Sequence, residues 1–148
     1  MIPKGLKIAV PFVWFGMLLA ISFMEAPLKF QAPGVTLPLG LGIGRLVFFV
    51  FNKMEIVSVL ILMAAFWRAR SNSKVETTLL GLAALILLLE TAWLLPALDA
   101  RAELVIAGIE QPYSNLHVIY IVLDAIKLIL LLTLGIVTTR HYLTEAGR

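Results

Sequence analysis

The chain has 148 residues, of which 61% are hydrophobic and only 14% charged, and its net charge is +3. A soluble domain is typically about 45–50% apolar and 25% charged, so this composition indicates an integral membrane protein. The apolar runs leave too few residues for a separate soluble domain, so residues 1–148 are expected to form a single transmembrane domain. The lack of cysteine excludes disulfides, thiolate catalysis, iron–sulfur clusters and the usual structural zinc sites. No basic run is long enough to indicate nucleic-acid binding, and the lipid bilayer is the expected partner.

The first apolar segment, residues 8–24, carries no charge and is long enough to cross a membrane. It follows Lys4 and Lys7, a basic head that is also typical of a secretory signal peptide. No cleavage motif of small residues follows the segment, so we expect a retained span, with a signal peptide as the alternative.

Three further spans are predicted over residues 41–67, 77–95 and 115–138. Pro96 is expected to bend or end the third of them. Apolar residues recur on one side of residues 99–111, which predicts a short amphipathic helix in the loop before the last span. The predicted fold is therefore an all-α, four-helix bundle in the membrane.

Basic residues concentrate in the head, in the turn between the second and third spans, and in the tail. Those of the turn and tail are Arg68, Arg70, Lys74, Arg140 and Arg148. The positive-inside rule predicts that both termini are cytoplasmic, and that the acidic loop after the third span lies outside. The predicted location is the bacterial inner membrane.

Acidic and basic residues interrupt three of the four spans at a common depth. Lys53, Glu55, Glu90, Asp124 and Lys127 each lie roughly 18–22 Å from the cytoplasmic end of their spans, for a helical rise of 1.5 Å per residue. Ionisable residues at such depths are costly unless they face the bundle interior and find partners. We therefore expect them to meet in one intramembrane site.

Helical spacing extends this site along the second and fourth spans. The full candidate set is Arg45, Asn52, Lys53, Glu55, Glu90, His117, Tyr120, Asp124 and Lys127. In the expected charge balance, Lys53 and Lys127 neutralise two of the three carboxylates, and Arg45 reaches down to the third. Lys53 points about 100° away from Asn52 on the same helix. Its side chain must therefore either lean across toward the site or contact another helix.

Two functions fit such a site. One is the binding or passage of a small polar solute, an ion or a proton, in a chain that would need to oligomerise to build a pore. The other is a non-catalytic accessory or scaffold subunit of a membrane complex, in which the charges form a structural salt-bridge network.

Catalytic and metal sites are not indicated. His117 and His141 lie about 36 Å apart along one helix direction, which excludes a haem held by both within one chain. No Glu-x-x-His motif accompanies the carboxylates, and no nucleophile–base pair is recognisable. We expect no metal and no cofactor, and an enzyme is not favoured.

Several short motifs resemble a family of small four-helix membrane proteins typified by transmembrane protein 205. They are Trp14-Phe15-Gly16, Ala26-Pro27 with Phe30, Leu95-Pro96 with Asp99 and Arg101, and Leu116-His117. The resemblance implies the four-helix fold and assigns no catalytic residue. The candidate site departs from it, because neither the Arg45 to Glu55 run nor the Asp124 and Lys127 pair belongs to that family's pattern.

Overall fold

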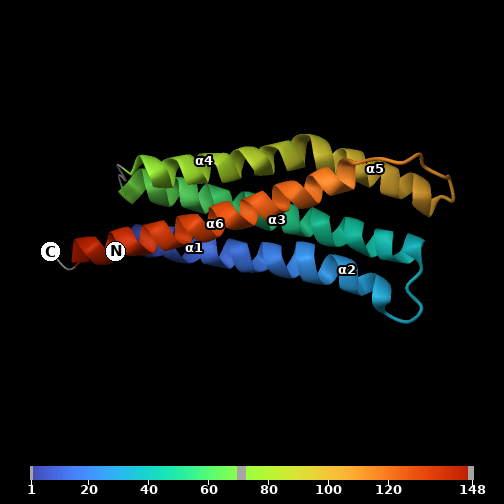
Figure 1. Cartoon of the computed structure of the whole chain (residues 1–148), viewed down its shortest axis with the longest axis horizontal. Coiled ribbons are helices and arrows are strands. Elements are labelled where there is room, and N and C mark those ends of the chain that lie inside the picture. Colours follow the sequence, from blue (N-terminus) through green and yellow to red (C-terminus); the bar gives the residue numbers. More distant parts are fainter. Residues whose placement is uncertain (1, 70–72, 147–148) are drawn as a thin grey trace.

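The computed structural model describes residues 2–69 and 73–146, which form four long helices and no strand (Figure 1). The first runs through α1 (Ile2–Leu18), η1 (Leu19–Glu25), α2 (Ala26–Leu28) and η2 (Lys29–Gln31). The second is α3 (Leu37–Ala69). The third runs through α4 (Lys74–Leu89), η3 (Glu90–Leu94) and α5 (Leu95–Ile106), and the fourth is α6 (Leu116–Ala146). The predicted all-α four-helix fold is confirmed. Arg70 and Arg148, two of the basic residues used for topology, lie outside the described residues.

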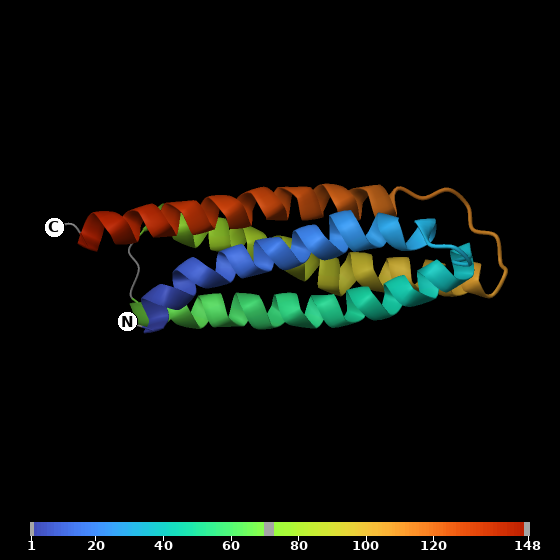
Figure 2. The same ribbon diagram turned by 90° about the horizontal axis from the view of Figure 1, so that it is seen from below.

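The four helices run side by side, with both ends of the chain at one end of the bundle (Figures 1 and 2). We call this the terminal end, and the end that holds the loops after η2 and α5 the opposite end. α1 packs against α3 and α6, while the third helix packs against α6 through α4 and against α3 chiefly through α5. Each helix therefore contacts two neighbours, and all four enclose one interior.

The core is apolar, and so is the outer surface. Trp14, Leu18, Leu62, Leu131 and Leu134 are fully buried at the centre of the bundle. Large hydrophobic side chains also cover the outward faces of all four helices. Each helix is long and apolar enough to cross a membrane. This is the pattern of a multi-pass membrane protein, in which lipid tails contact the outward faces.

The third helix is longer than predicted. It continues through Pro96 to Ile106, so residues 99–106 extend the third span and do not form a separate loop helix. It ends where Gly108 adopts φ 79° and the Ile109 N–H donates to the carbonyl of Leu104, an arrangement that favours glycine. Of the two effects expected of Pro96, bending or ending the span, the second does not occur, because a local change in helix winding accommodates the proline.

That change is a π-helical turn, and the first helix contains another. In η3 the N–H of Leu95 donates to the carbonyl of Glu90, and in η1 the N–H of Ala26 donates to Ile21. The residue after each donor is a proline, Pro96 and Pro27 respectively. A proline lacks the N–H and disturbs the preceding turn, and a wider turn relieves the conflict. Single π turns inside α-helices are frequent at functional sites.

Candidate functional site

A buried lysine lies at the centre of the candidate site. Lys127 Nζ is 2.8 Å from Glu55 Oε1 and 3.0 Å from Asp124 Oδ1, and it donates a hydrogen bond to Glu90 Oε2. The four side chains are at most 1% exposed. We call Glu55, Glu90, Asp124 and Lys127 the buried cluster. The structure thus brings together four of the residues that sequence analysis placed at one depth.

Local helix geometry explains how these side chains converge. Asp124 and Lys127 stand three residues apart on α6 and so share one face of that helix. Glu90 is the first residue of the wide turn η3, and Glu55 lies on the buried face of α3. Trp14 on α1 donates from Nε1 to Glu55 Oε1 at 3.0 Å. One connected set of polar contacts therefore joins all four long helices.

The charges of the buried cluster do not cancel. Three carboxylates and one ammonium carry a formal charge of −2 if all four are ionised. In the described part of the chain, no further cation lies within ion-pair distance of these carboxylates. Glu90 Oε1 and both carboxylate oxygens of Asp124 also lack a hydrogen-bond partner there. Asp124 Oδ1 is close to Lys127 but outside hydrogen-bonding geometry, so its contact is purely electrostatic.

Further polar groups lie on the opposite-end side of the buried cluster. Asn52 Nδ2 donates to Thr91 Oγ1 at 2.8 Å. Tyr120 is 4% exposed, and its ring packs edge-on against Phe48 with centroids 5.6 Å apart. Ser22 Oγ is buried without a hydrogen-bond partner among the described residues. Asn52 and Tyr120 precede Glu55 and Asp124 by about one helical turn, which corresponds to roughly 5 Å.

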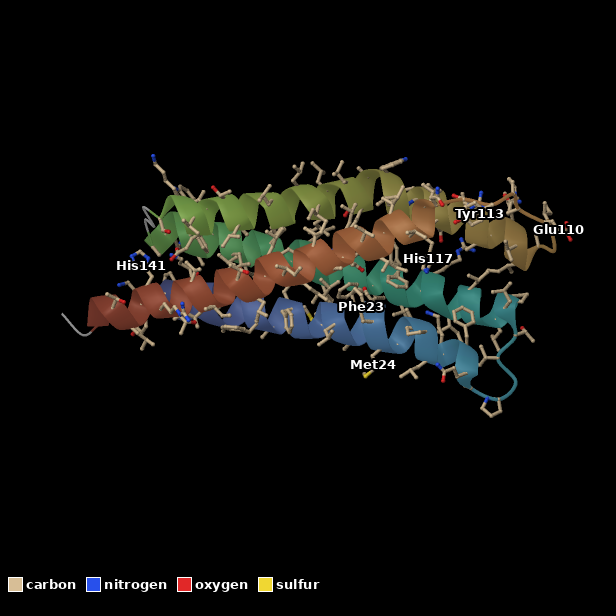
Figure 3. All side chains as sticks on the ribbon, in the orientation of Figure 1. Phe23, Met24, Glu110, Tyr113, His117 and His141 are labelled. Atoms are coloured by element: carbon tan, nitrogen blue, oxygen red, sulfur yellow. The ribbon has the colours of Figure 1, made fainter. Side chains whose placement is uncertain are left out.

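The remaining candidates lie away from the buried cluster. Lys53 is exposed on the outer face of α3, with its Nζ 5.1 Å from the centroid of the Phe49 ring. Arg45 is about 15 Å of helix from Glu55 and instead pairs with Asp99 at 2.6 Å. His117 is exposed near the opposite end (Figure 3). The prediction that Lys53 and Arg45 neutralise carboxylates of the cluster was therefore wrong. The angular position of Lys53 on α3 places it on the outer face, and Arg45 pairs with the nearer Asp99.

On the terminal-end side, the buried cluster is followed by an apolar layer. Leu62, Leu87, Leu131 and Leu134 are each at most 3% exposed, and with their neighbours they form the hydrophobic core. A polar side chain, Ser58, is also buried on this side, and its hydroxyl donates to the carbonyl of Met54 on its own helix at 2.8 Å. Among the described residues, the polar contact between neighbouring helices that runs from Asn52 to Thr91 lies on the opposite-end side of the cluster, whereas the side chains on the terminal-end side are mostly leucines.

A second buried polar cluster, which sequence analysis did not identify, lies at the terminal end. Glu76 is fully buried, with Lys7 Nζ at 2.8 Å and His141 Nδ1 at 3.1 Å. Figure 3 shows His141 at this end. The sequence held one signal for the position of Glu76, a serine three residues before it. Ser73 is the N-cap of α4, and its Oγ accepts from the Glu76 N–H at 3.4 Å. Trp14 and Thr91 were also missed, because their sequence positions do not reveal which helices become neighbours.

The buried cluster places acidic and basic side chains in direct contact inside the bundle. Its carboxylates converge on an ammonium, and the described residues contain no group of three or more His, Cys, Asp or Glu able to hold a metal ion. His117 and His141 lie toward different ends of the bundle (Figure 3). Comparison with protein-family models, curated proteins and solved structures finds no match. The function of the buried cluster is therefore inferred from the residues of this chain.

Proposed function

We propose that this protein binds and transfers protons within the membrane, and that the buried cluster is the proton-binding station. The observation that carries the proposal is the excess of three buried carboxylates over one buried ammonium. Net charge is costly in hydrocarbon, and carboxylates that share a site do not readily ionise together. One carboxylate balances Lys127, so the neutral cluster holds two protons on the other carboxyl groups.

A proton suits this site better than a larger solute does. The four side chains are packed against one another with at most 1% exposure, and a proton needs no cavity. Glu90 Oε1 and the Asp124 oxygens supply atoms on which a proton can reside without breaking a hydrogen bond. Small movements of the Lys127 ammonium among its three partners would change which carboxyl group is neutral.

The polar surroundings support proton exchange with the opposite end. Asn52, Thr91 and Tyr120 lie on that side, whereas the apolar layer separates the cluster from the terminal end. We infer from the basic residues that the terminal end is cytoplasmic, with both termini there. In the bacterial inner membrane that we propose as the location, the cluster would then exchange protons with the outside.

Transfer to the other side requires a rearrangement, and the wide turns support one. Glu90 begins η3, so a shift of this turn toward regular α-helical winding would rotate Glu90 relative to Lys127. The turn η1 lies in the first helix, which contacts the cluster through Trp14. Segments of irregular helix often act as hinges. Such a movement would break the Lys127–Glu90 contact and open the cluster toward the apolar layer.

Proton flux into vesicles tests the proposal. The purified chain is reconstituted into vesicles that contain a pH-sensitive dye, and a potassium diffusion potential drives protons inward. We expect faster acidification than in protein-free vesicles, and loss of the difference in Glu90→Gln and Asp124→Asn. Glu103→Gln is the matched control, because the Glu103 side chain is 68% exposed and lies outside the cluster. Equal flux in all variants and in empty vesicles would reject proton transfer.

The second candidate is an accessory or scaffold subunit. The observation that favours it is that Lys127 contacts both Glu55 and Glu90 while Trp14 donates to Glu55, which ties all four helices together. In that case the neutral variants would lose stability, and the wild type would show no flux. The resemblance to the family of transmembrane protein 205 remains a proposal that fits either function, because it supplies a fold and no catalytic residue.

A further inference from the structure

Lys53 is a charged residue on a surface that otherwise faces lipid. It is the middle residue of α3 (Leu37–Ala69), and its side chain is exposed. Its aromatic neighbour Phe49 is 64% exposed. No carboxylate in the described ranges forms an ion pair with Lys53. The monomer therefore leaves a cation near the centre of the bilayer with only an aromatic ring beside it.

The lysine is too deep to reach water along the helix. A hydrocarbon core about 30 Å thick places each interface roughly 15 Å from the middle of an upright span. An extended lysine side chain reaches roughly 6 Å from its Cα, so snorkelling covers less than half of that distance. Charged residues at such depths usually face a protein partner that neutralises them.

A second copy of this chain cannot supply that partner. At this depth the carboxylates of the described residues are Glu55, Glu90 and Asp124, and each is at most 1% exposed. A symmetric dimer about the membrane normal would also bring Lys53 toward Lys53 of the partner. The missing countercharge must come from a different chain.

We propose that this face of α3 docks a transmembrane helix of another protein that carries an aspartate or glutamate near its centre. The face runs at helical spacing over Leu46, Phe49, Val50, Lys53, Val57 and Leu60. Its apolar members are 50–72% exposed, which provides a continuous stripe for a partner helix. The proposal does not depend on proton transfer, because it uses the outer face of α3 and not the buried cluster.

Energy transfer in vesicles tests the docking. The chain has no cysteine, so Thr144→Cys provides one labelling position in the tail. The probe is a synthetic leucine–alanine transmembrane peptide of about 20 residues with one central aspartate. The matched peptide has leucine at that position. We expect the full chain to bind the aspartate peptide about tenfold more tightly than the leucine peptide.

Two variants make the test specific. Lys53→Leu should reduce the preference to about twofold or less, and Lys53→Asp should restore it toward a peptide with a central lysine. Lys53 is exposed, so circular dichroism should show an unchanged fold in both variants. In a relocation control, Lys53→Leu is combined with Leu88→Lys, which places the lysine on the 60% exposed Leu88 position of another helix.

Three results would overturn the proposal. The first is equal binding of the aspartate and leucine peptides by the wild-type chain. The second is a preference that survives in Lys53→Leu or in the relocation control, which would show that this face is not required. The third is self-association of the wild-type chain that Lys53→Leu abolishes, because a second copy would then occupy the face.

Discussion

Replacing Lys127 by methionine should strongly destabilise the bundle. Methionine has a similar length and no charge, so the variant leaves Glu55, Glu90 and Asp124 facing one another without a cation. Removing one partner of a buried ion pair typically costs about 3–5 kcal/mol. Because Lys127 contacts three carboxylates, we expect a loss of at least about 3 kcal/mol at neutral pH. Acidification should reduce the loss, since the carboxylate that Lys127 balanced would then be protonated and need no cation.

Unfolding in mixed detergent micelles measures this loss, with circular dichroism as the readout. Lys53→Met is the matched control, because it makes the same chemical change at nearly the same depth but on the exposed face of α3. We expect the control to change the free energy of unfolding by no more than about 0.5 kcal/mol. Adding Glu90→Gln to Lys127→Met should recover about 1–3 kcal/mol, because it removes one acidic group from a cluster that has lost its cation. A loss below about 1 kcal/mol in Lys127→Met would refute the reasoning, since the ammonium would then not be holding the carboxylates together.

Two further predictions use the same assay. Trp14→Phe removes the indole donor to Glu55 and should cost about 1–3 kcal/mol, and a change below about 0.5 kcal/mol would show that the bond adds little. Gly81→Ala should stabilise the third helix by about 0.5–1 kcal/mol, because an added Cβ meets nothing within 4 Å. Gly135→Ala should lose that gain, because its Cβ would lie 2.7 Å from the Phe12 ring where α1 crosses α6. Equal stability of the two alanine variants would contradict this account of the crossing.

The fold was predictable because the membrane imposes a simple rule. Four long apolar runs without water to bond their backbone must form helices. Their ends were less predictable, because the third helix gains a turn at Ser73 and continues past Pro96 through a change in winding. The span boundaries were predicted from hydrophobicity, and neither the N-cap at Ser73 nor the change in winding before Pro96 changes the hydrophobicity of the sequence.

The candidate site was predictable in depth but not in direction. Equal depth singled out Glu55, Glu90, Asp124 and Lys127, which the structure brings into contact. Depth alone also included Lys53, although its angular position on the helix already pointed away from the stripe. The contact from Trp14 depends on which helices become neighbours, and no spacing within one helix carries that information.

The protonation of the buried cluster is the most direct test of the account. Infrared spectroscopy distinguishes the carbonyl band of a protonated carboxyl group from the bands of an ionised carboxylate. Spectra of the wild-type chain in bilayers at neutral pH are compared with those of Glu55→Gln, Glu90→Gln and Asp124→Asn. The account predicts a protonated-carboxyl band in the wild type that weakens in at least one of these variants. A band that is missing from the wild type, or that no variant changes, would show that all three carboxylates are ionised and would contradict the account.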